Sequence, residues 1–393
     1  MMRFLVKHLI PNYEDIHDAK IRTKYGNLTS FVGILANLVL FLGKFLIGTL
    51  ANSVSITADA VNNLSDAGSS MISLISFKLS NRPADEEHPF GHARYEYIAS
   101  MIVGILILFL GIELVQNSLD KIIHPQTIAF SLLSIGILIA SILVKFWMYA
   151  YNRYYGKQLN SSVMSATAAD SLSDCMATAA VLASTCISPL IHFNLDGYMG
   201  VLVAIFIITA GIKIVKETLN SLLGASPSRE EVMEIVDLIK SHEGVLGIHD
   251  LMIHDYGPNN RFASVHVEVS AKEDIFISHD MIDNIEREIH EKLQIQMVIH
   301  MDPIDVDDEE TNTMRETMKN IVTSIDPSLS IHDFRMVKGN THTNLIFDCL
   351  VPYQIKLTTN QIMDQINEQL NTLDQTYYVV VTFDHAFTSE IKK

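Results

Sequence analysis

The stretch Asn62-Asn63-Leu64-Ser65-Asp66 interrupts an apolar segment, and Asp170-Ser171-Leu172-Ser173-Asp174 interrupts another one later in the chain. In each stretch the outer residues are four positions apart, so on a helix they share a face and offer side-chain oxygens together. Two such faces packed against each other would present four ligands to one cation. Because a carboxylate is costly at membrane depth, it marks an ion or substrate pathway by default.

Apolar sequence surrounds both stretches. Residues from about 28 to 223 are rich in Leu, Ile, Ala, Val and Gly, and six segments reach the roughly 17 to 25 residues that a membrane-spanning helix needs. The predicted spans are 29–51, 54–80, 95–117, 128–152, 163–187 and 196–223. The second and fifth spans carry the two polar stretches and are the least apolar. This is expected of helices that line a polar path.

The positions of the basic residues predict how the spans are oriented. They gather before the first span, between the second and third, and between the fourth and fifth: Arg3, Lys7, Lys20, Arg22, Lys24, Arg82, Arg94, Arg153 and Lys157. The other three loops contribute only Lys121. The positive-inside rule therefore predicts that both termini are cytosolic. Neither a signal peptide nor a transit peptide is evident, which favours a multi-pass protein of the cell membrane.

The charge balance narrows the class of partner. The chain has 45 acidic and 28 basic residues and a formal net charge of −17. Most of the acidic excess lies beyond residue 225, and an acidic surface argues against nucleic acid and for cations. The three cysteines, Cys175, Cys186 and Cys349, have no paired spacing and predict neither a disulfide framework nor a thiolate metal site.

An internal repeat organises the soluble part. Gly247-Ile248-His249-Asp250-Leu251 is echoed by Ser330-Ile331-His332-Asp333-Phe334, and Val298 to Asp302 is echoed by Val380 to Asp384. From the His-Asp pair to the closing Asp the separation is 53 residues in one copy (249 to 302) and 52 in the other (332 to 384). Each copy is expected to be a small α+β domain, with a three-stranded sheet packed on two helices.

The predicted fold is therefore an α-helical membrane protein with six transmembrane helices followed by two cytosolic α+β domains. The expected segments are a cytosolic N-terminal segment, the six-helix domain, the first α+β domain, an acidic linker and the second α+β domain: 1–27, 28–224, 225–304, 305–310 and 311–393.

With these features together, the chain resembles the cation diffusion facilitator family of divalent-metal transporters. The resemblance covers residues from about 20 to 303 and includes the loop His88-Pro89-Phe90-Gly91-His92 and the closing His300-Met301-Asp302-Pro303. It implies a homodimer in the lipid bilayer that exchanges a cytosolic divalent cation for protons, and so a secondary transporter rather than an enzyme. The second α+β copy departs from the family's common single-domain plan.

The resemblance carries the transport site onto Asn62, Asp66, Asp170 and Asp174. Zinc-preferring members typically place a histidine in the fifth-helix motif, whereas every ligand here is an oxygen. Oxygen ligands suit hard ions such as Mn²⁺, and imidazole favours Zn²⁺. The chain therefore looks like the manganese-type branch, with Fe²⁺, Co²⁺ and Zn²⁺ as alternative substrates. The plainer interpretation is that these residues are packing groups that bond across the helix bundle.

Two further metal sites follow from the same resemblance. The loop site would use Asp85, His88 and His92. The cytosolic site would use histidines and one aspartate of the first α+β copy: His249, His266, His279, His300 and Asp302. The alternatives are a solvated loop and ordinary surface histidines. No cofactor is expected, and Zn²⁺ or other divalent ions would be bound at these sites.

Two other functions stay open from the residues alone. A membrane-anchored metal sensor would explain the histidines but would leave the polar intramembrane stretches without a use. An intramembrane metallohydrolase would need a His-Glu-x-x-His pair on a helix, and none occurs in the six spans.

Overall fold

The computed structural model describes residues 2–16, 18–50, 54–124, 132–191, 195–339, 342–373 and 377–385. The chain has two compact units. The first comprises Met1–Ala225 with Asp255–Asn260, and the second comprises Ser226–His254 with Arg261–Lys393.

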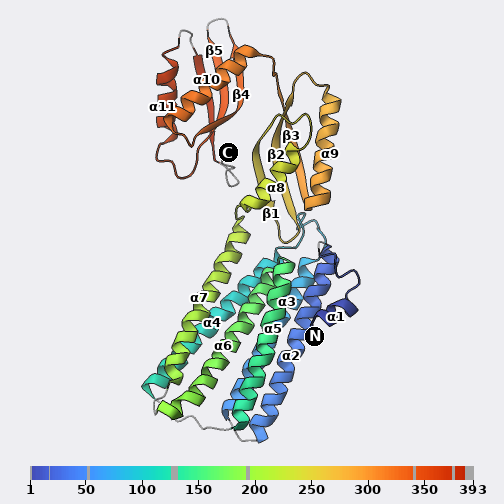
Figure 1. Cartoon of the computed structure of the whole chain (residues 1–393), viewed down its shortest axis with the longest axis vertical. Coiled ribbons are helices and arrows are strands. Elements are labelled where there is room, and N and C mark those ends of the chain that lie inside the picture. The colour runs from blue at the N-terminus through green and yellow to red at the C-terminus, as the bar shows by residue number, and fades with distance from the viewer. Residues whose placement is uncertain are drawn as a thin grey trace. The chain divides into compact units, whose positions relative to one another are not determined.

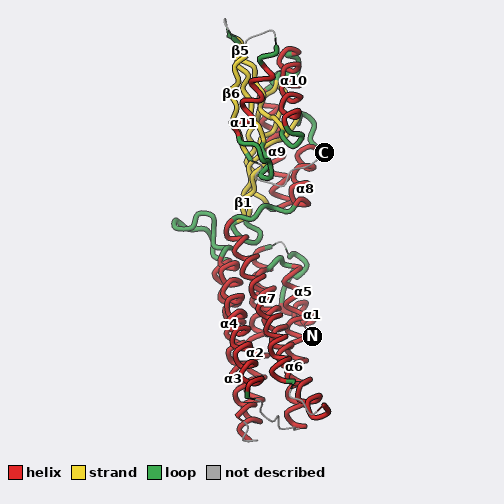
Figure 2. The backbone as a smooth tube through the Cα atoms, turned by 90° about the vertical axis from the view of Figure 1, so that its left-hand side faces the viewer, coloured by secondary structure: helices red, strands yellow, loops and turns green. Residues whose placement is uncertain are grey.

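Long helices running side by side make up most of the first unit (Figures 1 and 2). After the short α1 (Met2–Leu9) come six of them: α2 (Ala19–Leu50), α3 (Val54–Ser80), α4 (Tyr95–Ile123), α5 (Leu132–Gln158), α6 (Ser162–Ile191) and α7 (Asp196–Leu223). All six predicted apolar segments therefore fall on helices. The expected end of the first segment, residue 51, and the expected start of the fourth, 128–131, lie outside the described residues.

Hydropathy separates these helices into two groups. Among the described residues, four stretches are long and apolar enough to cross a membrane: Lys20–Ile47, Tyr95–Ile123, Ile135–Gln158 and Gly197–Leu223. They belong to α2, α4, α5 and α7. Helices α3 and α6 fall short of this criterion, and they are the helices that carry the two polar stretches.

Glycines allow close helix packing in the first unit. A Cβ atom on Gly104 of α4 would lie 2.9 Å from the Ile214 side chain, and one on Gly200 of α7 would lie 2.1 Å from the Ser118 hydroxyl. Between α2 and α3, a Cβ atom on Gly26 would lie 2.3 Å from the buried Phe77 ring. Small residues at helix contacts are typical of membrane bundles.

A buried ion pair joins α2 to α4. The Arg22 guanidinium lies 2.6 Å from a carboxylate oxygen of Glu96, whose side chain is completely buried. The Arg22 Nε also donates to the Leu159 carbonyl, just beyond the end of α5. This charge pair at the ends of three helices was not predicted from the sequence.

The second unit begins with an α+β region built on a three-stranded sheet. Its elements are α8 (Arg229–Lys240), β1 (Gly247–Asp255), β2 (Arg261–Ser270), α9 (Ile275–Leu293) and β3 (Ile295–Ile304). The strand order is β1-β2-β3, and β2 runs parallel to β3 with His266 opposite His300. Alternate strand residues such as Val265 and Val267 join the helices in one apolar core, so His266 and its neighbours lie on the other face.

A second α+β region repeats this element order. It consists of α10 (Glu309–Ile325), β4 (Ser330–Lys338), β5 (Thr343–Leu350), α11 (Thr359–Leu370) and β6 (Tyr377–Asp384). Its sheet has the order β4-β5-β6, and β5 runs parallel to β6 with Asp348 opposite Thr382. It has an apolar core of its own, around Phe347 and Ile366. Both regions thus have the expected three-stranded sheet on two helices.

One backbone feature recurs in the two regions. Asp250 follows His249 with a φ of 52°, and Asp333 follows His332 with a φ of 49°. Aspartate is among the few residues other than glycine that adopt this left-handed conformation readily. The His-Asp echo in the sequence therefore reflects a shared local geometry.

Candidate metal sites

Two aspartates of the polar stretches meet at a buried lysine. The Lys145 ammonium of α5 lies 2.6 Å from Asp66 Oδ2 of α3 and 2.6 Å from Asp174 Oδ2 of α6. Lys145 is 3% exposed, and distances this short are typical of charge-assisted hydrogen bonds. The two polar stretches therefore converge as expected, and a positive charge lies between them.

Asp170 completes what we call the membrane cluster: Asp66, Lys145, Asp170 and Asp174. It is 4% exposed, accepts a hydrogen bond from Ser69, and interacts electrostatically with the other three members. A hydroxyl contact of 2.8 Å between Ser73 of α3 and Thr167 of α6 packs the two helices together beside the cluster. Three carboxylates from two helices thus share one buried location.

Two further residues stand near this cluster. Lys44 of α2 is buried and interacts electrostatically with Asp66, so a second cation balances the carboxylates. Asn62, the fourth predicted ligand, is exposed and lies one helical turn before Asp66 on α3. The described contacts do not bring Asn62 to the three aspartates.

Neither Lys145 nor Lys44 was predicted to lie beside the carboxylates of the polar stretches. Each is a lone charge inside an apolar run, Leu143-Val144-Lys145-Phe146-Trp147 and Phe41-Leu42-Gly43-Lys44-Phe45. A buried intramembrane charge generally needs a partner of opposite sign, so this isolation was the available signal. Which carboxylates would be the partners depends on helix packing, which the sequence does not encode locally.

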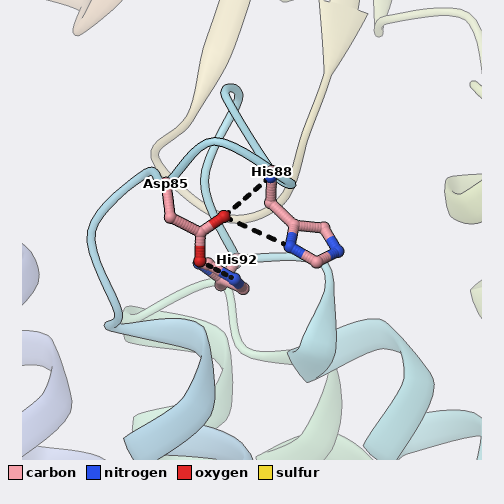
Figure 3. A group of neighbouring side chains, drawn as sticks. All are labelled: Asp85, His88 and His92. Atoms are coloured by element: carbon pink, nitrogen blue, oxygen red, sulfur yellow. Dashed lines mark hydrogen bonds and ion pairs between the residues drawn. The ribbon is translucent and has the colours of Figure 1, made fainter.

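The loop between α3 and α4 gathers the predicted loop ligands, which we call the loop cluster. Figure 3 shows the Asp85 carboxylate between the His88 and His92 side chains. One Asp85 oxygen lies 3.4 Å from His88 Nδ1 and the other lies 3.4 Å from His92 Nε2. The His88 backbone N–H also donates to Asp85, which lowers the pKa of this carboxyl below its usual value.

The orientation of His92 suits a metal ligand. Its Nδ1 lies 3.0 Å from the Pro83 carbonyl, which can only accept, so Nδ1 carries the proton. In the neutral ring, Nε2 then turns a lone pair toward Asp85. Two acceptors face each other stably only with a proton or a cation between them. An imidazole held through its other nitrogen by a carbonyl is the usual arrangement at metal sites.

Three of the predicted cytosolic ligands form a first-sheet cluster on the helix-free face of the β1-β2-β3 sheet: His249, His266 and Asp302. Asp302 Oδ2 lies 3.2 Å from His249 Nε2 and 2.8 Å from His266 Nδ1. His300, opposite His266 in the parallel register, reaches the other Asp302 oxygen at 3.2 Å but is largely exposed.

His279 is not brought to this cluster. It is exposed on α9, and no described contact joins it to the other four predicted ligands. The physical reason is the helix phase: Ser278, Ile282 and Ile285 face the core, and one residue further along the helix points about 100° away. Within one chain the predicted five-residue site therefore reduces to three ligands with His300 beside them.

A further group lies where the two α+β regions meet. It contains one histidine and three aspartates, which we call the inter-region cluster: Asp250, His332, Asp348 and Asp384. The neighbouring imidazoles of His249 and then His332 lower the pKa of Asp250 below its usual value, so this carboxyl is ionised at neutral pH. Nothing in the sequence pattern connected Asp250 with His332, which lie in different copies of the repeat.

A helix bundle with buried carboxylates, joined to an α+β region with a histidine and carboxylate cluster, is an arrangement suited to a transporter of metal cations. Comparison with known families agrees with it. Residues 30–223 match the cation efflux transmembrane domain, and residues 227–304 match the cytoplasmic domain of cation efflux proteins. The chain therefore belongs to the cation efflux, or cation diffusion facilitator, family: it is a multi-pass membrane protein that transports divalent metals. The predicted family is confirmed.

Individual relatives align over most of their own length. An uncharacterized transporter of Methanocaldococcus jannaschii is 29% identical over 279 residues, which is 70% of this chain and 97% of the relative. The cation-efflux pumps FieF of Salmonella paratyphi A and Salmonella agona are 28% identical over 286 residues, 72% of this chain and 95% of each relative. Residues 305–393 lie beyond both matched domains.

Proposed function

We propose that this protein exports Mn²⁺ from the cytosol in exchange for protons, with Asn62, Asp66, Asp170 and Asp174 as its transport ligands. The observation that carries the proposal is the Lys145 ammonium held 2.6 Å from both Asp66 and Asp174. The bundle already binds one positive charge at the point where the two polar stretches converge. A divalent cation that displaced it would find carboxylates from two helices.

The donor set supports a hard ion. Every proposed ligand is an oxygen, and carboxylate and amide oxygens suit Mn²⁺, whereas imidazole would favour Zn²⁺. Affinity at a fixed site still rises from Mn²⁺ through Fe²⁺ and Co²⁺, and Zn²⁺ also binds more tightly than Mn²⁺. Selectivity for Mn²⁺ would then come from geometry and from the supply of each ion, so Fe²⁺, Co²⁺ and Zn²⁺ stay as alternative substrates.

Exchange for protons follows from charge balance. When the metal leaves, the carboxylates stay behind in a region where unpaired charge is costly. Lys145 and Lys44 can balance two of the three negative charges, and a proton arriving from outside can balance the third. Metal and protons compete for the same oxygens, so an inward proton gradient would drive metal outward.

The proposal also includes the number of membrane spans, their orientation, the cellular location and the oligomeric state. We propose that α3 and α6 also span the membrane, giving six spans, because each packs among apolar helices and contributes carboxylates to the membrane cluster. The distribution of basic residues favours cytosolic termini, and the cell membrane is the proposed location. Homodimer formation is part of the same proposal, supported by the family to which the chain belongs.

The test uses purified protein in liposomes with an imposed pH gradient, with Mn²⁺ and Zn²⁺ uptake measured side by side. We expect gradient-driven Mn²⁺ uptake that exceeds Zn²⁺ uptake and is abolished by Asp170→Ala. Removing Asp170 deletes a ligand but no large packing group, so this variant should keep the wild-type elution volume on size exclusion.

The other results would each revise the proposal. Faster uptake of Zn²⁺ would mean that site geometry outweighs ligand hardness. Full transport by Asp170→Ala would remove the membrane cluster as the transport site. Uptake of neither ion by well-folded protein would favour a membrane-anchored metal sensor.

A further inference from the structure

We propose that a metal site joins the two α+β regions and takes a hard divalent cation such as Mn²⁺. Its ligands are the members of the inter-region cluster, one imidazole and three carboxylates: His332, Asp250, Asp348 and Asp384. The site is separate from the transport ligands and does not depend on the proposed direction of transport.

The ligand atoms are close enough to share one ion. One nitrogen or oxygen of each residue lies within 4.8 Å of the corresponding atom of every other member. His332 Nε2 lies 3.3 Å from Asp250 Oδ2 and 3.4 Å from Asp384 Oδ2. Ligands bound at about 2.1 Å to one ion lie about 3.0 Å apart at right angles and about 3.4 Å apart at tetrahedral angles. The observed separations match this spacing.

These separations do not match direct hydrogen bonds. A charge-assisted hydrogen bond between imidazolium and carboxylate would be about 2.7–2.9 Å long. His332 Nε2 is shielded from solvent and makes no hydrogen bond, and the same is true of Asp384 Oδ1. A buried polar atom without a partner is costly and needs an explanation. A cation bound among these atoms would satisfy both.

The sheet geometry explains how the four residues meet. Asp348 and Asp384 lie on neighbouring parallel strands, two register positions apart, on the face of the sheet opposite the helices. His332 comes from β4, which pairs with β5 so that His332 stands opposite Asp348. The fourth ligand comes from the other region, because the left-handed backbone of Asp250 turns its carboxylate toward His332.

The composition of this site differs from that of the first-sheet cluster. In the repeat, Asp348 stands where the first copy has His266, and Thr382 stands where it has His300. One imidazole with three carboxylates is a harder donor set than two imidazoles with one carboxylate, so it suits Mn²⁺ better than Zn²⁺. Because one ligand belongs to the first region and three to the second, a bound ion would tie the regions together.

The test counts Mn²⁺ bound to the full-length protein. Protein stripped of metal with a chelator is dialysed to equilibrium against Mn²⁺. The number of Mn²⁺ ions bound per chain is then measured by inductively coupled plasma mass spectrometry. We expect Asp348→Asn and Asp250→Asn each to remove one equivalent or to weaken one by at least tenfold. Asp333→Asn is the matched control, because Asp333 has the same backbone conformation as Asp250 but pairs with Arg335 outside the cluster.

A second measurement, hydrogen exchange, distinguishes the loss of a metal ligand from misfolding of the variant. In wild-type protein, Mn²⁺ should slow hydrogen exchange in both β1 and β4, and Asp384→Asn should abolish that effect while the metal-free exchange pattern stays unchanged. Asp170→Ala should remove a different equivalent, so a combined Asp170→Ala and Asp348→Asn variant should lose both.

Three results would overturn the proposal. They are full Mn²⁺ stoichiometry with unchanged affinity in Asp348→Asn, an equal loss in Asp333→Asn, and wild-type protein in which Mn²⁺ leaves exchange in β1 and β4 unchanged. In each case the four side chains would be an ion-pair contact between the regions and no metal site.

Discussion

At the scale of single residues, Lys145 decides how the membrane cluster behaves. Its ammonium lies 2.6 Å from Asp66 and from Asp174, which is where the proposed transport site would bind its cation. A metal ion must therefore displace a charge that is part of the protein. Two unit charges about 4 Å apart interact by roughly 4 kcal/mol at the effective dielectric constant found near protein surfaces, so this competition is substantial.

Replacing Lys145 by methionine should tighten metal binding. With the competing ammonium gone, we expect the Kd for Mn²⁺ to fall at least tenfold, about 1.4 kcal/mol, and transport to slow because release becomes the harder step. Isothermal titration of the purified protein measures the first effect, and liposome uptake measures the second.

Lys145→Arg is the control for this experiment, because this variant keeps the positive charge. Its affinity should stay close to that of the wild-type protein. Weaker Mn²⁺ binding by well-folded Lys145→Met would show that the ammonium orients the carboxylates for the metal and does not compete with it.

At the scale of elements, the two polar stretches could be assigned from sequence because the helical repeat fixes which residues share a face. The loop cluster was predicted from the family resemblance, and its three ligands lie within eight residues, from Asp85 to His92. The three carboxylates and the loop ligands are found where they were expected. His279 and Asn62 were the exceptions, because both are exposed and no described contact brings either one to its predicted cluster.

What the sequence did not provide were contacts between distant elements. Lys145 is 79 residues from Asp66, and Arg22 is 74 residues from Glu96. The inter-region cluster likewise needs Asp250 and His332 together, and these belong to different repeats. Such contacts depend on how helices and sheets pack, and no local pattern of hydrophobic periodicity carries that information.

The packing of α2 on α3 gives a prediction at this scale. Gly26→Ala should destabilise the protein, because the added Cβ atom would lie 2.3 Å from the carbon atoms of the buried Phe77 ring. Overpacking of this kind costs about 1–3 kcal/mol, and in domains of about 150–250 residues each kcal/mol lowers the melting temperature by about 2–4 °C. Thermal unfolding of the detergent-solubilised protein measures the change.

A glycine on the same helix provides the control. Gly43 has open space around its Cα atom, with nothing within 4 Å of an added Cβ atom. Gly43→Ala should leave the melting temperature unchanged or raise it slightly, because alanine favours the helix. If both variants melted alike, close approach at Gly26 would not be what sets the packing of α2 on α3.

At the scale of the whole molecule, the two α+β regions have separate apolar cores. The relatives align over nearly their whole length with only 70–72% of this chain, and the matched cytoplasmic domain ends at residue 304. The second region therefore lies outside the part of the chain that matches the cation efflux family.

Deleting residues 309–393 should leave metal transport largely intact. We expect gradient-driven Mn²⁺ uptake at a rate comparable with the full chain, and one fewer Mn²⁺ bound per chain because three of the four inter-region ligands are gone. A truncated protein that is monodisperse but inactive would show that the second region takes part in the transport cycle itself.

The short connection between β3 and α10 has a quantitative consequence. Only the residues between Ile304 and Glu309 separate the two regions, so Asp250 and His332 are held at a high effective concentration, in the millimolar range for short flexible tethers. A site assembled from two separate chains would fill more readily as the protein became more abundant in the membrane. A site assembled within one chain responds to the concentration of free metal alone, and its threshold would be the same in a cell with few transporters as in a cell with many.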